Sequence, residues 1–170
     1  EVDALRLTTR DEPDYDKLMR HRLKQLDKTS ITLSKIQEVI RQLKPFPGAV
    51  EFLDKLRERT QVIILSDTFE QFAAPLMGQL HWPTLFCHRL IVEEDKIIDY
   101  KLRMPDQKRQ SVMALKSIDF QVIAAGDSFN DTPMLAEADH AFLFHAPENI
   151  VAQFPEFSAI NDYDELLKAI

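Results

Sequence analysis

Oxygen-bearing side chains crowd one short loop in the second half of the chain. The apolar run 122–125 is followed by a glycine, and then by Asp127, Asn130 and Asp131 within five positions. Carboxylate and amide oxygens are the hard ligands that Mg²⁺ prefers, and Mg²⁺ takes only one or two protein carboxylates. We therefore expect Asp127 to bind Mg²⁺. For Asp131 two interpretations stay open, a metal ligand or the N-cap of the helix expected directly after it.

A second polar sequence, Ser66-Asp67-Thr68, follows the apolar run 62–65. A hydroxyl and free backbone N–H groups at a strand-to-helix junction form a cradle for phosphate oxygens. The same residue types are good helix N-caps, so this sequence by itself leaves both interpretations open. Because a metal-binding loop is expected at the end of a neighbouring strand, we favour contact between Ser66 and a phosphoryl group.

Two basic side chains are candidates for binding the anionic groups of a ligand. Lys108 lies at the start of an expected helix, where the helix dipole disfavours a cation, so a nearby anion would explain its position. The adjacent Arg109 is an alternative for this role. Arg22 lies closer than Arg20 to the apolar face of the helix expected over 14–27, where it could hold a carboxylate through two hydrogen bonds. The alternative is that Arg22 is an ordinary surface arginine.

These candidates need a fold that brings the ends of strands together. Apolar residues recur at helical spacing over 1–46, whereas short apolar strands and amphipathic helices alternate over 47–170. Such alternation predicts an α/β fold with a doubly wound, mainly parallel sheet, in which ligands bind beyond the carboxyl ends of the strands. We place the boundary between the two parts at 46/47, within Pro-Phe-Pro-Gly.

The individual elements follow from the same periodicities. The expected strands are 62–65, 89–92, 97–102, 122–125 and 141–144, with a short apolar stretch at 85–86, and 89–92 and 97–102 form a hairpin. The expected helices are 14–27, 49–60, 69–80, 107–117, 132–137 and 162–170. Another helix, capped by Ser30 or Thr32, has a predicted buried stripe of Ile36, Val39, Ile40 and Leu43.

Composition limits the partners. The chain has 170 residues with 28 acidic and 21 basic side chains, a formal net charge of −7, which argues against a nucleic-acid partner. No apolar run approaches the ~18 residues that a membrane helix needs, so no membrane partner is expected. The single cysteine, Cys87, excludes a disulfide within the chain and suits a reducing compartment, which predicts a cytoplasmic location. The five histidines show no metal-ligand spacing, and we expect them to be structural.

Three segments together resemble the haloacid dehalogenase superfamily. Residues 64–68, Lys108 and residues 126–131 look like the second, third and fourth motifs of that superfamily, in the same order. The helical segment 15–26 is similar to the cap of phosphoserine phosphatases, so 1–46 is interpreted as a small helical cap. Ser66-Asp67-Thr68 stands where ordinary phosphoserine phosphatases usually carry Ser-Gly-Gly. That difference, with the segments 108–111, 124–128 and 144–149, is similar to the bifunctional phosphoserine phosphatase/homoserine phosphotransferase branch.

The resemblance implies a catalytic role for Ser66, Lys108 and Asp131. Ser66 would hydrogen-bond the transferring phosphoryl group, and Lys108 would neutralise that group and an aspartyl-phosphate intermediate. Asp131, together with Asn130, would shape the loop and hold Lys108. Asp127 would bind Mg²⁺. This is electrostatic catalysis, in which fixed cations and donors meet the charge that develops on the phosphoryl group.

The resemblance also implies the residues that bind substrate. Arg22 would grip the carboxylate of phosphoserine, and Ser66, Asp67 and Asn130 would complete the set. The implied reaction is hydrolysis of phosphoserine, with transfer of the phosphate to homoserine as a further activity.

The first motif of the superfamily, Asp-x-Asp on a strand, has no counterpart in the sequence. It supplies the nucleophile, and neither Asp3 nor Asp11-Glu12 fits it because no apolar strand precedes either. The resemblance therefore implies a preceding strand that lies between the strands ending at 65 and 125. If no such strand exists, the alternative function is a non-catalytic phosphoamino-acid binder or regulatory protein, and a further alternative is a core without activity of its own.

Overall fold

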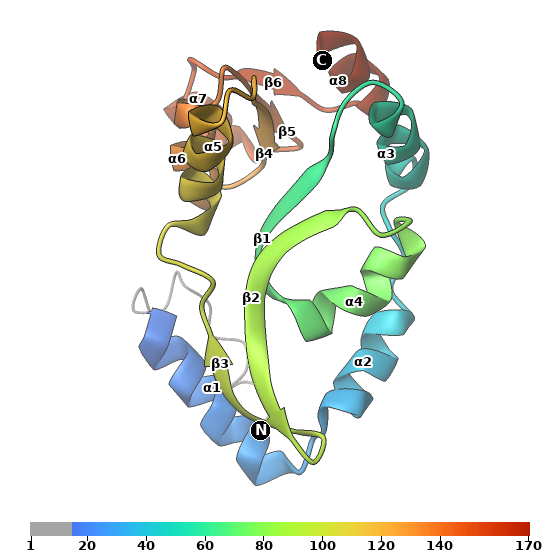
Figure 1. Ribbon diagram of the computed structural model, residues 1–170, viewed down its shortest axis with the longest axis vertical. Coiled ribbons are helices and arrows are strands. Elements are labelled where there is room, and N and C mark those ends of the chain that lie inside the picture. The colour runs from blue at the N-terminus through green and yellow to red at the C-terminus, as the bar shows by residue number, and fades with distance from the viewer. Residues whose placement is uncertain (1–14) are drawn as a thin grey trace. The chain divides into compact units, whose positions relative to one another are not determined.

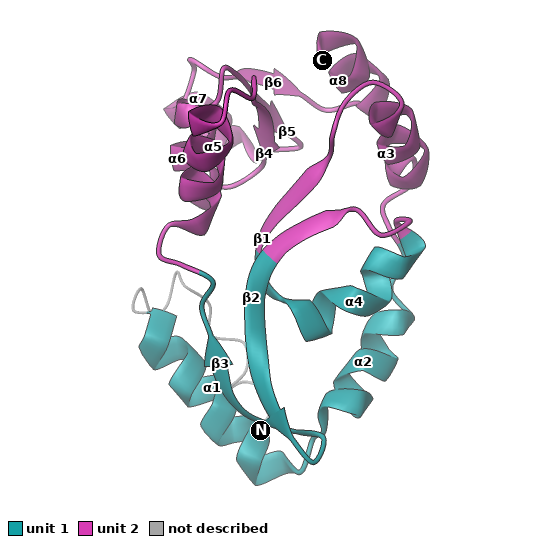
Figure 2. Cartoon of the chain, in the orientation of Figure 1, with its two compact units in different colours: residues 1–44, 67–79, 87–103 teal, residues 45–66, 80–86, 104–170 magenta. Residues whose placement is uncertain are grey.

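The computed structural model describes residues 15–170, which form two compact units (Figures 1 and 2). Of the described residues, unit 1 comprises 15–44, 67–79 and 87–103, and unit 2 comprises 45–66, 80–86 and 104–170. The first division, between Lys44 and Pro45, lies close to the boundary predicted at 46/47. The segments 67–79 and 87–103 nevertheless group with the N-terminal helices. Asp3 and Asp11-Glu12 lie outside the described residues.

Unit 1 is built from helices packed against a hairpin. Helix α1 (Tyr15–Thr29) packs on strand β3 (Lys96–Lys101), and α2 (Leu33–Arg41) packs on α4 (Glu70–Gln79). Strand β2 (Thr84–Glu93) enters the unit at Cys87 and pairs antiparallel with β3, from Arg89↔Lys101 to Glu93↔Lys96. The apolar core of this unit comprises Met19, Leu23, Leu33, Phe69, Leu90 and Ile97.

The tip of the hairpin also fixes the start of α2. Glu94 and Asp95 have φ angles of 46° and 66°, the left-handed pair that a two-residue hairpin turn requires. The Asp95 carboxylate accepts hydrogen bonds from the N–H and the hydroxyl of Ser34, at 3.0 and 2.9 Å. Thr32 is the N-cap of α2, one of the two predicted caps. The polar turn of the hairpin therefore stabilises the start of helix α2, although Ser34 and Asp95 are 61 positions apart in the sequence.

Unit 2 contains the parallel sheet. Strands β4 (Ile123–Gly126), β5 (His140–Phe144) and β6 (Ser158–Ile160) pair in parallel in that order. Helix α6 (Thr132–Glu137) packs on β4, β5 and helix α5 (Gln107–Ser117), whereas α3 (Ala49–Arg57) packs on α8 (Tyr163–Ala169). The core residues Val112, Leu135 and Leu143 are at most 1% exposed. The predicted α/β fold with mainly parallel strands is confirmed.

Strand β1 (Ile63–Phe69) is longer than predicted. The expectation was a strand 62–65 and a helix from Phe69, with Ser66-Asp67-Thr68 at the junction. Those three residues instead lie inside the strand, and α4 begins at Glu70. Thr68 and Phe69 favour extended backbone, and Phe69, 5% exposed, packs edge-on against Phe72. The predicted cradle of free N–H groups at a helix start is therefore wrong for Ser66.

The predicted apolar stripe of α2 is also partly wrong. Val39 and Leu43 are 63% and 54% exposed, because the helix ends at Arg41 and turns another face inward. That face carries Leu33 and Ile36, which contact the core, and Gln37, whose side-chain amide donates to the carbonyl of Gln71 on α4. Helix α7 (Glu148–Gln153) and strand β6 were not predicted. No helix within residues 15–170 is long and apolar enough to span a membrane.

Candidate active site

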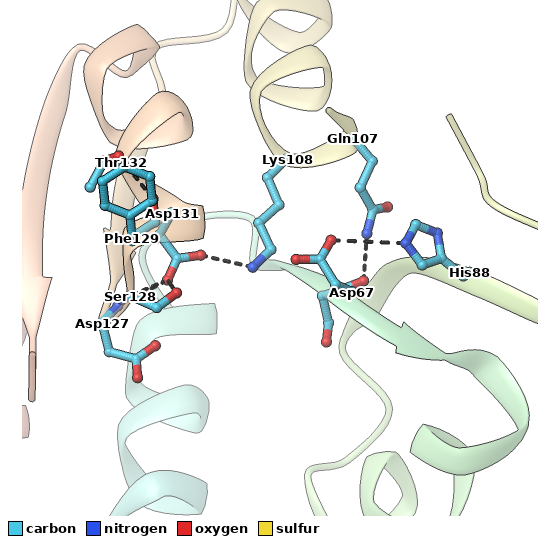
Figure 3. A network of polar contacts seen from close by, with 10 residues as sticks. Asp67, His88, Gln107, Lys108, Asp127, Ser128, Phe129, Asp131 and Thr132 are labelled. Atoms are coloured by element: carbon cyan, nitrogen blue, oxygen red, sulfur yellow. Dashed lines mark hydrogen bonds and ion pairs between the residues drawn. The ribbon is translucent and has the colours of Figure 1, made fainter. Parts of the chain in front are cut away.

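The loop after β4 folds around the carboxylate of Asp131 (Figure 3). One oxygen, Oδ2, accepts the backbone N–H of Asp127 at 3.1 Å and that of Ser128 at 3.0 Å, and it also accepts the Ser128 hydroxyl at 2.8 Å. These contacts form a capping box on the short 3₁₀ helix η2 (Phe129–Asp131). Asp131 also occupies the N-cap position of α6, as the helix-cap interpretation expects, but its side chain makes no cap hydrogen bond to that helix.

Gly126 makes room for this carboxylate. A Cβ atom at residue 126 would lie 2.5 Å from the Cβ of Asp131 and 2.7 Å from its Cγ, far inside van der Waals contact. The last residue of β4 therefore has to lack a side chain if Asp131 is to fold back beneath the loop. A glycine is needed at residue 126 because the Asp131 side chain approaches the backbone closely there. A left-handed backbone is not the reason, since the φ angle of Gly126 is not positive.

The second oxygen of Asp131 binds Lys108. Lys108 is on the first turn of α5, and its Nζ donates to Asp131 Oδ1 at 2.8 Å, with the two side chains only 14% and 8% exposed. Burial by itself raises the pKa of Asp131, but the hydrogen bond and charge of Lys108 and the two hydrogen bonds from Ser128 outweigh it. The pKa of Asp131 is therefore lower than usual. The anion that the position of Lys108 implied is the carboxylate of Asp131, and the neighbouring Arg109 instead pairs with Glu137.

Asp127 presents the other carboxylate of the loop. Its side chain is exposed and points away from Asp131 (Figure 3), and it makes no hydrogen bond or ion pair with any described residue. Within the described part of the chain no three His, Cys, Asp or Glu side chains gather as a metal site. A free carboxylate fits Mg²⁺, which uses few protein ligands and keeps several waters. Both oxygens of Asp131, in contrast, already accept hydrogen bonds from the protein.

Ser66 is tied to the same helix as Lys108. Gln107, which precedes Lys108 in α5 and is 3% exposed, donates from Nε2 to the backbone carbonyl of Ser66 at 2.5 Å. A chain of contacts thus links Ser66 through α5 to Asp131 and the loop that carries Asp127. The sequence analysis missed Gln107 and Ser128. The spacing Ser128-x-x-Asp131 is a capping-box signal that could have identified the serine.

The remaining candidates are divided between the two units. Asn130 is exposed on η2, next to Asp131. Asp67 and Arg22 belong to unit 1, where Asp67 is exposed on β1 and Arg22 is half-buried on α1. The pKa of Tyr15 is raised, first by burial and then by the charge of Asp67, while the charge of Arg22 acts in the opposite direction. Both charged groups therefore lie near the Tyr15 hydroxyl, within one unit.

These features define an α/β protein of the Rossmann-like class, with charged groups gathered beyond the carboxyl end of a parallel strand. Residues 4–139 match the model of the haloacid dehalogenase-like hydrolases, and the chain belongs to that family. The predicted superfamily, and the prediction of a hydrolase, are confirmed.

Curated relatives and solved structures agree with this assignment. The chain is 58% identical to a phosphoserine phosphatase of Pseudomonas syringae over 98% of its own length and 71% of the relative. It is also 58% identical to the phosphoserine phosphatase ThrH of Pseudomonas aeruginosa, over 97% of the chain and 81% of the relative. A solved phospho-aspartyl intermediate analogue of phosphoserine phosphatase has the same fold, with a TM-score of 0.71 and 22% identity over 89% of this chain and 77% of the other.

A methyl group at residue 126 tests the geometry of the loop. Gly126→Ala places a Cβ against Asp131 and should lower the free energy of unfolding by about 3 kcal/mol or more, because it overpacks the site and displaces a buried ion pair. Gly78→Ala, at an exposed position in α4, is the matched control and should change stability by no more than about 1 kcal/mol, in the stabilising direction. Urea unfolding measures both. Equal effects of the two substitutions would contradict the close approach.

The lowered pKa of Asp131 predicts how acid affects stability. Native Asp131 binds a proton less readily than the same residue in the unfolded chain, so its contribution is complete above the unfolded pKa and is lost as the pH falls through the lower native one. The stability difference between the native sequence and Asp131→Asn should therefore be constant above about pH 5 and should shrink below about pH 4. Urea unfolding of both proteins from pH 2 to 7 measures it. A difference that grows as the pH falls would show that the pKa is raised.

Proposed function

We propose that this protein is a Mg²⁺-dependent phosphomonoesterase that hydrolyses phosphoserine through an aspartyl-phosphate. The observation that carries the proposal is the buried pair of Lys108 and Asp131, set on the loop that presents the free carboxylate of Asp127. The names of the curated relatives support the substrate. A net charge of −7 supports a small-molecule substrate over nucleic acid, and the single cysteine supports a cytoplasmic location.

Lys108 supplies positive charge at a fixed point. An ammonium held by a buried carboxylate cannot swing away into solvent, so little reorganisation is needed when negative charge develops on a phosphoryl group beside it. The hydroxyl of Ser66, whose backbone is tied to α5, would donate a hydrogen bond to the same group. Phosphoryl transfer depends on such positioning and charge neutralisation more than on covalent chemistry by the protein.

Phosphatases of the haloacid dehalogenase superfamily generally use Mg²⁺, and Asp127 is the residue here that would hold it. When bound, the ion would supply charge neutralisation for the phosphate and the attacking carboxylate. Asp131 would not coordinate it, because its oxygens bind Lys108 and the loop. The remaining ligands would be waters, substrate oxygens and a second carboxylate.

We propose that the second carboxylate and the nucleophile belong to a strand that precedes residue 1 in the full protein. Strand β1 lies at the end of the order β1-β2-β3, and β4 lies at the end of the order β4-β5-β6. Each of these two strands therefore has one edge that pairs with no other described strand. Buried ladder groups without partners cost about 1–3 kcal/mol each, which favours a strand at these edges.

The amino-acid part of the substrate would be recognised by residues of opposite charge. Arg22 would hold its carboxylate, and Asp67 and Asn130 would complete the substrate-binding set with Ser66. Asp67-Thr68 stands where ordinary relatives of this kind carry Gly-Gly, and this difference supports transfer of the phosphate to the hydroxyl of homoserine as a second activity. Adding homoserine to the assay tests it, because phosphohomoserine then forms at the expense of inorganic phosphate.

Phosphate release from phosphoserine by the full-length protein tests the proposed function. We expect turnover with Mg²⁺, its loss with EDTA, and a fall in kcat of about 100-fold or more for Asp127→Asn, because a catalytic cation loses its carboxylate. Asp119→Asn, a change of the same kind at an exposed position after α5, is the control and should retain activity. Binding of phosphoserine in a calorimeter without turnover under any divalent metal would contradict the enzyme and favour the non-catalytic binder.

Two arginines two positions apart on α1 test substrate recognition. Arg22→Lys replaces a two-pronged donor by a point charge and should raise KM for phosphoserine about tenfold with little change in kcat. Arg20→Lys is the matched control: Arg20 pairs with Asp99 and Asp16 at the surface, so KM should stay within about twofold. An equal effect of both substitutions on KM would contradict the assignment of Arg22.

A further inference from the structure

The first turn of α5 carries Lys108 but has no apolar side chain and no side-chain cap. Residues 107–111 are all polar, and the first residue of the helix that belongs to the apolar core is Val112. Asp106, at the N-cap position, has a φ angle of 47° and makes no side-chain hydrogen bond to the helix. The first N–H groups of a helix have no partners within it, so such a turn frays unless contacts from outside hold it.

Arg109 attaches this turn to the end of α6. Its Nε donates to Oε1 of Glu137 at 2.8 Å, and its Nη2 lies 2.7 Å from the same oxygen. Two nitrogens of the guanidinium therefore converge on one carboxylate oxygen, which a lysine cannot reproduce because its ammonium is a single point. Glu137 is the last residue of α6, so Arg109 binds that helix at its C-terminus.

Lys108 attaches the same turn to the other end of α6. Its Nζ donates to Oδ1 of Asp131 (Figure 3), and Asp131 directly precedes the six residues of α6. Six residues of helix span about 9 Å, so two consecutive residues of α5 bind α6 at well-separated points. One attachment would let α5 pivot about it, whereas two fix its direction. The pair of Arg109 and Glu137 therefore helps to determine where the backbone of Lys108 lies relative to Asp131.

The rest of α5 is held by other contacts. Near its C-terminus the Nζ of Lys116 donates to the backbone carbonyl of Glu137 at 2.8 Å and pairs with Asp139 at 2.9 Å. Val112 and Leu135 join α5 and α6 in the apolar core of unit 2. These contacts all come after the first turn. The first turn depends on its own polar side chains, among which Arg109 supplies the contact to the end of α6.

The charges of the first turn also require this pairing. Two adjacent cations at a helix N-terminus are disfavoured by the helix dipole. Each is offset by a carboxylate from the other helix or its loop, Lys108 by Asp131 and Arg109 by Glu137. The two pairs thus divide the work: one ammonium lies on the loop of the candidate site, and one guanidinium lies at the opposite end of α6.

We propose that Arg109 is a positioning residue: through Glu137 it fixes the first turn of α5 against α6, and it thereby holds the ammonium of Lys108 where the phosphoryl group reacts. The inference rests on the proposed function for the role of Lys108. It gives a task to the cation that the sequence could not separate from Lys108. Arg109 does not touch the substrate but determines the point at which Lys108 does.

Loss of the guanidinium should lower kcat and leave KM nearly unchanged, because Lys108 acts on charge that develops in the transition state. In the full-length protein we expect Arg109→Met to lower kcat for phosphoserine about tenfold, with KM within about twofold. Arg109→Lys keeps the charge without the two-pronged contact and should lower kcat about threefold. Arg57→Met is the matched control: Arg57 forms a partly buried pair with Asp54 at 2.8 Å in α3, and its loss should leave kcat within about twofold.

Glu137 tests whether Arg109 acts through this contact. Glu137→Gln alone should lower kcat about threefold, because a neutral amide oxygen is a weaker acceptor for a guanidinium. In the Arg109→Met background the same change should alter kcat by less than about twofold, since the contact is already lost. Independent effects of the two substitutions, or equal losses of kcat in Arg109→Met and Arg57→Met, would overturn the proposal.

The position of Lys108 can also be followed without catalysis. Reductive methylation with formaldehyde and cyanoborohydride, read by mass spectrometry, reports how often the Nζ of Lys108 becomes accessible, since its side chain is only 14% exposed. We expect Lys108 to be methylated about tenfold faster in Arg109→Met than in the native protein or in Arg57→Met, because local opening of the first turn becomes easier. An unchanged rate would show that Arg109 does not hold Lys108.

These measurements separate the inference from the proposed function. Failure of the native protein to release phosphate from phosphoserine would contradict the proposed function and the catalytic part of this inference, whereas faster methylation would still support the hold of Arg109 on Lys108. If Arg109→Met does not fold, Arg109→Lys and Glu137→Gln carry both measurements. Native kcat and a native methylation rate in both of these variants would then contradict the proposal.

Discussion

The carboxylate of Asp131 is a buried negative charge on which the candidate site depends. One oxygen accepts two backbone N–H groups and a hydroxyl from its own loop, and the other accepts the ammonium of Lys108. Burial of a charge is costly unless it is paired and hydrogen-bonded. Here the same contacts that satisfy the charge also shape the loop and hold the lysine, so a single side chain ties the loop after β4 to helix α5.

This constraint separates the two aspartates of the loop by role. Asp131 is occupied by the protein, and Asp127, four residues earlier, has its carboxylate turned away from it and free of described partners. The carboxylate of Asp131 is engaged by the protein, whereas that of Asp127 is exposed to solvent, so two similar side chains in one loop have different surroundings. The absence of a side chain at Gly126 is what allows this division, because Asp131 folds back into the space that a Cβ would fill.

Local spacing predicted the parts of the site that lie within a few residues of each other. The strand-glycine-loop pattern identified Asp127 and Asp131, and the alternation of strands and helices predicted the α/β fold. Contacts between residues far apart in the sequence could not be predicted from spacing. Gln107 donates a hydrogen bond to Ser66, 41 positions earlier, and the contact between His88 and Arg103 depends on the register of the hairpin. Ser66 was placed at a helix start, but its neighbours continue the strand because Phe69 is needed in the core of unit 1. The link from Lys108 to Asp131 came from family resemblance, because no spacing rule connects residues 23 positions apart.

The coupling between Lys108 and Asp131 is the claim on which the account of the site depends most. A double-mutant cycle in urea unfolding, with Lys108→Met, Asp131→Asn and the two together in the full-length protein, measures it directly. For a pair this buried the account predicts a coupling of about 2 kcal/mol or more, with the double substitution less costly than the sum of the two single ones. Additive effects, within about 0.5 kcal/mol, would show that the two side chains act independently and would contradict the account.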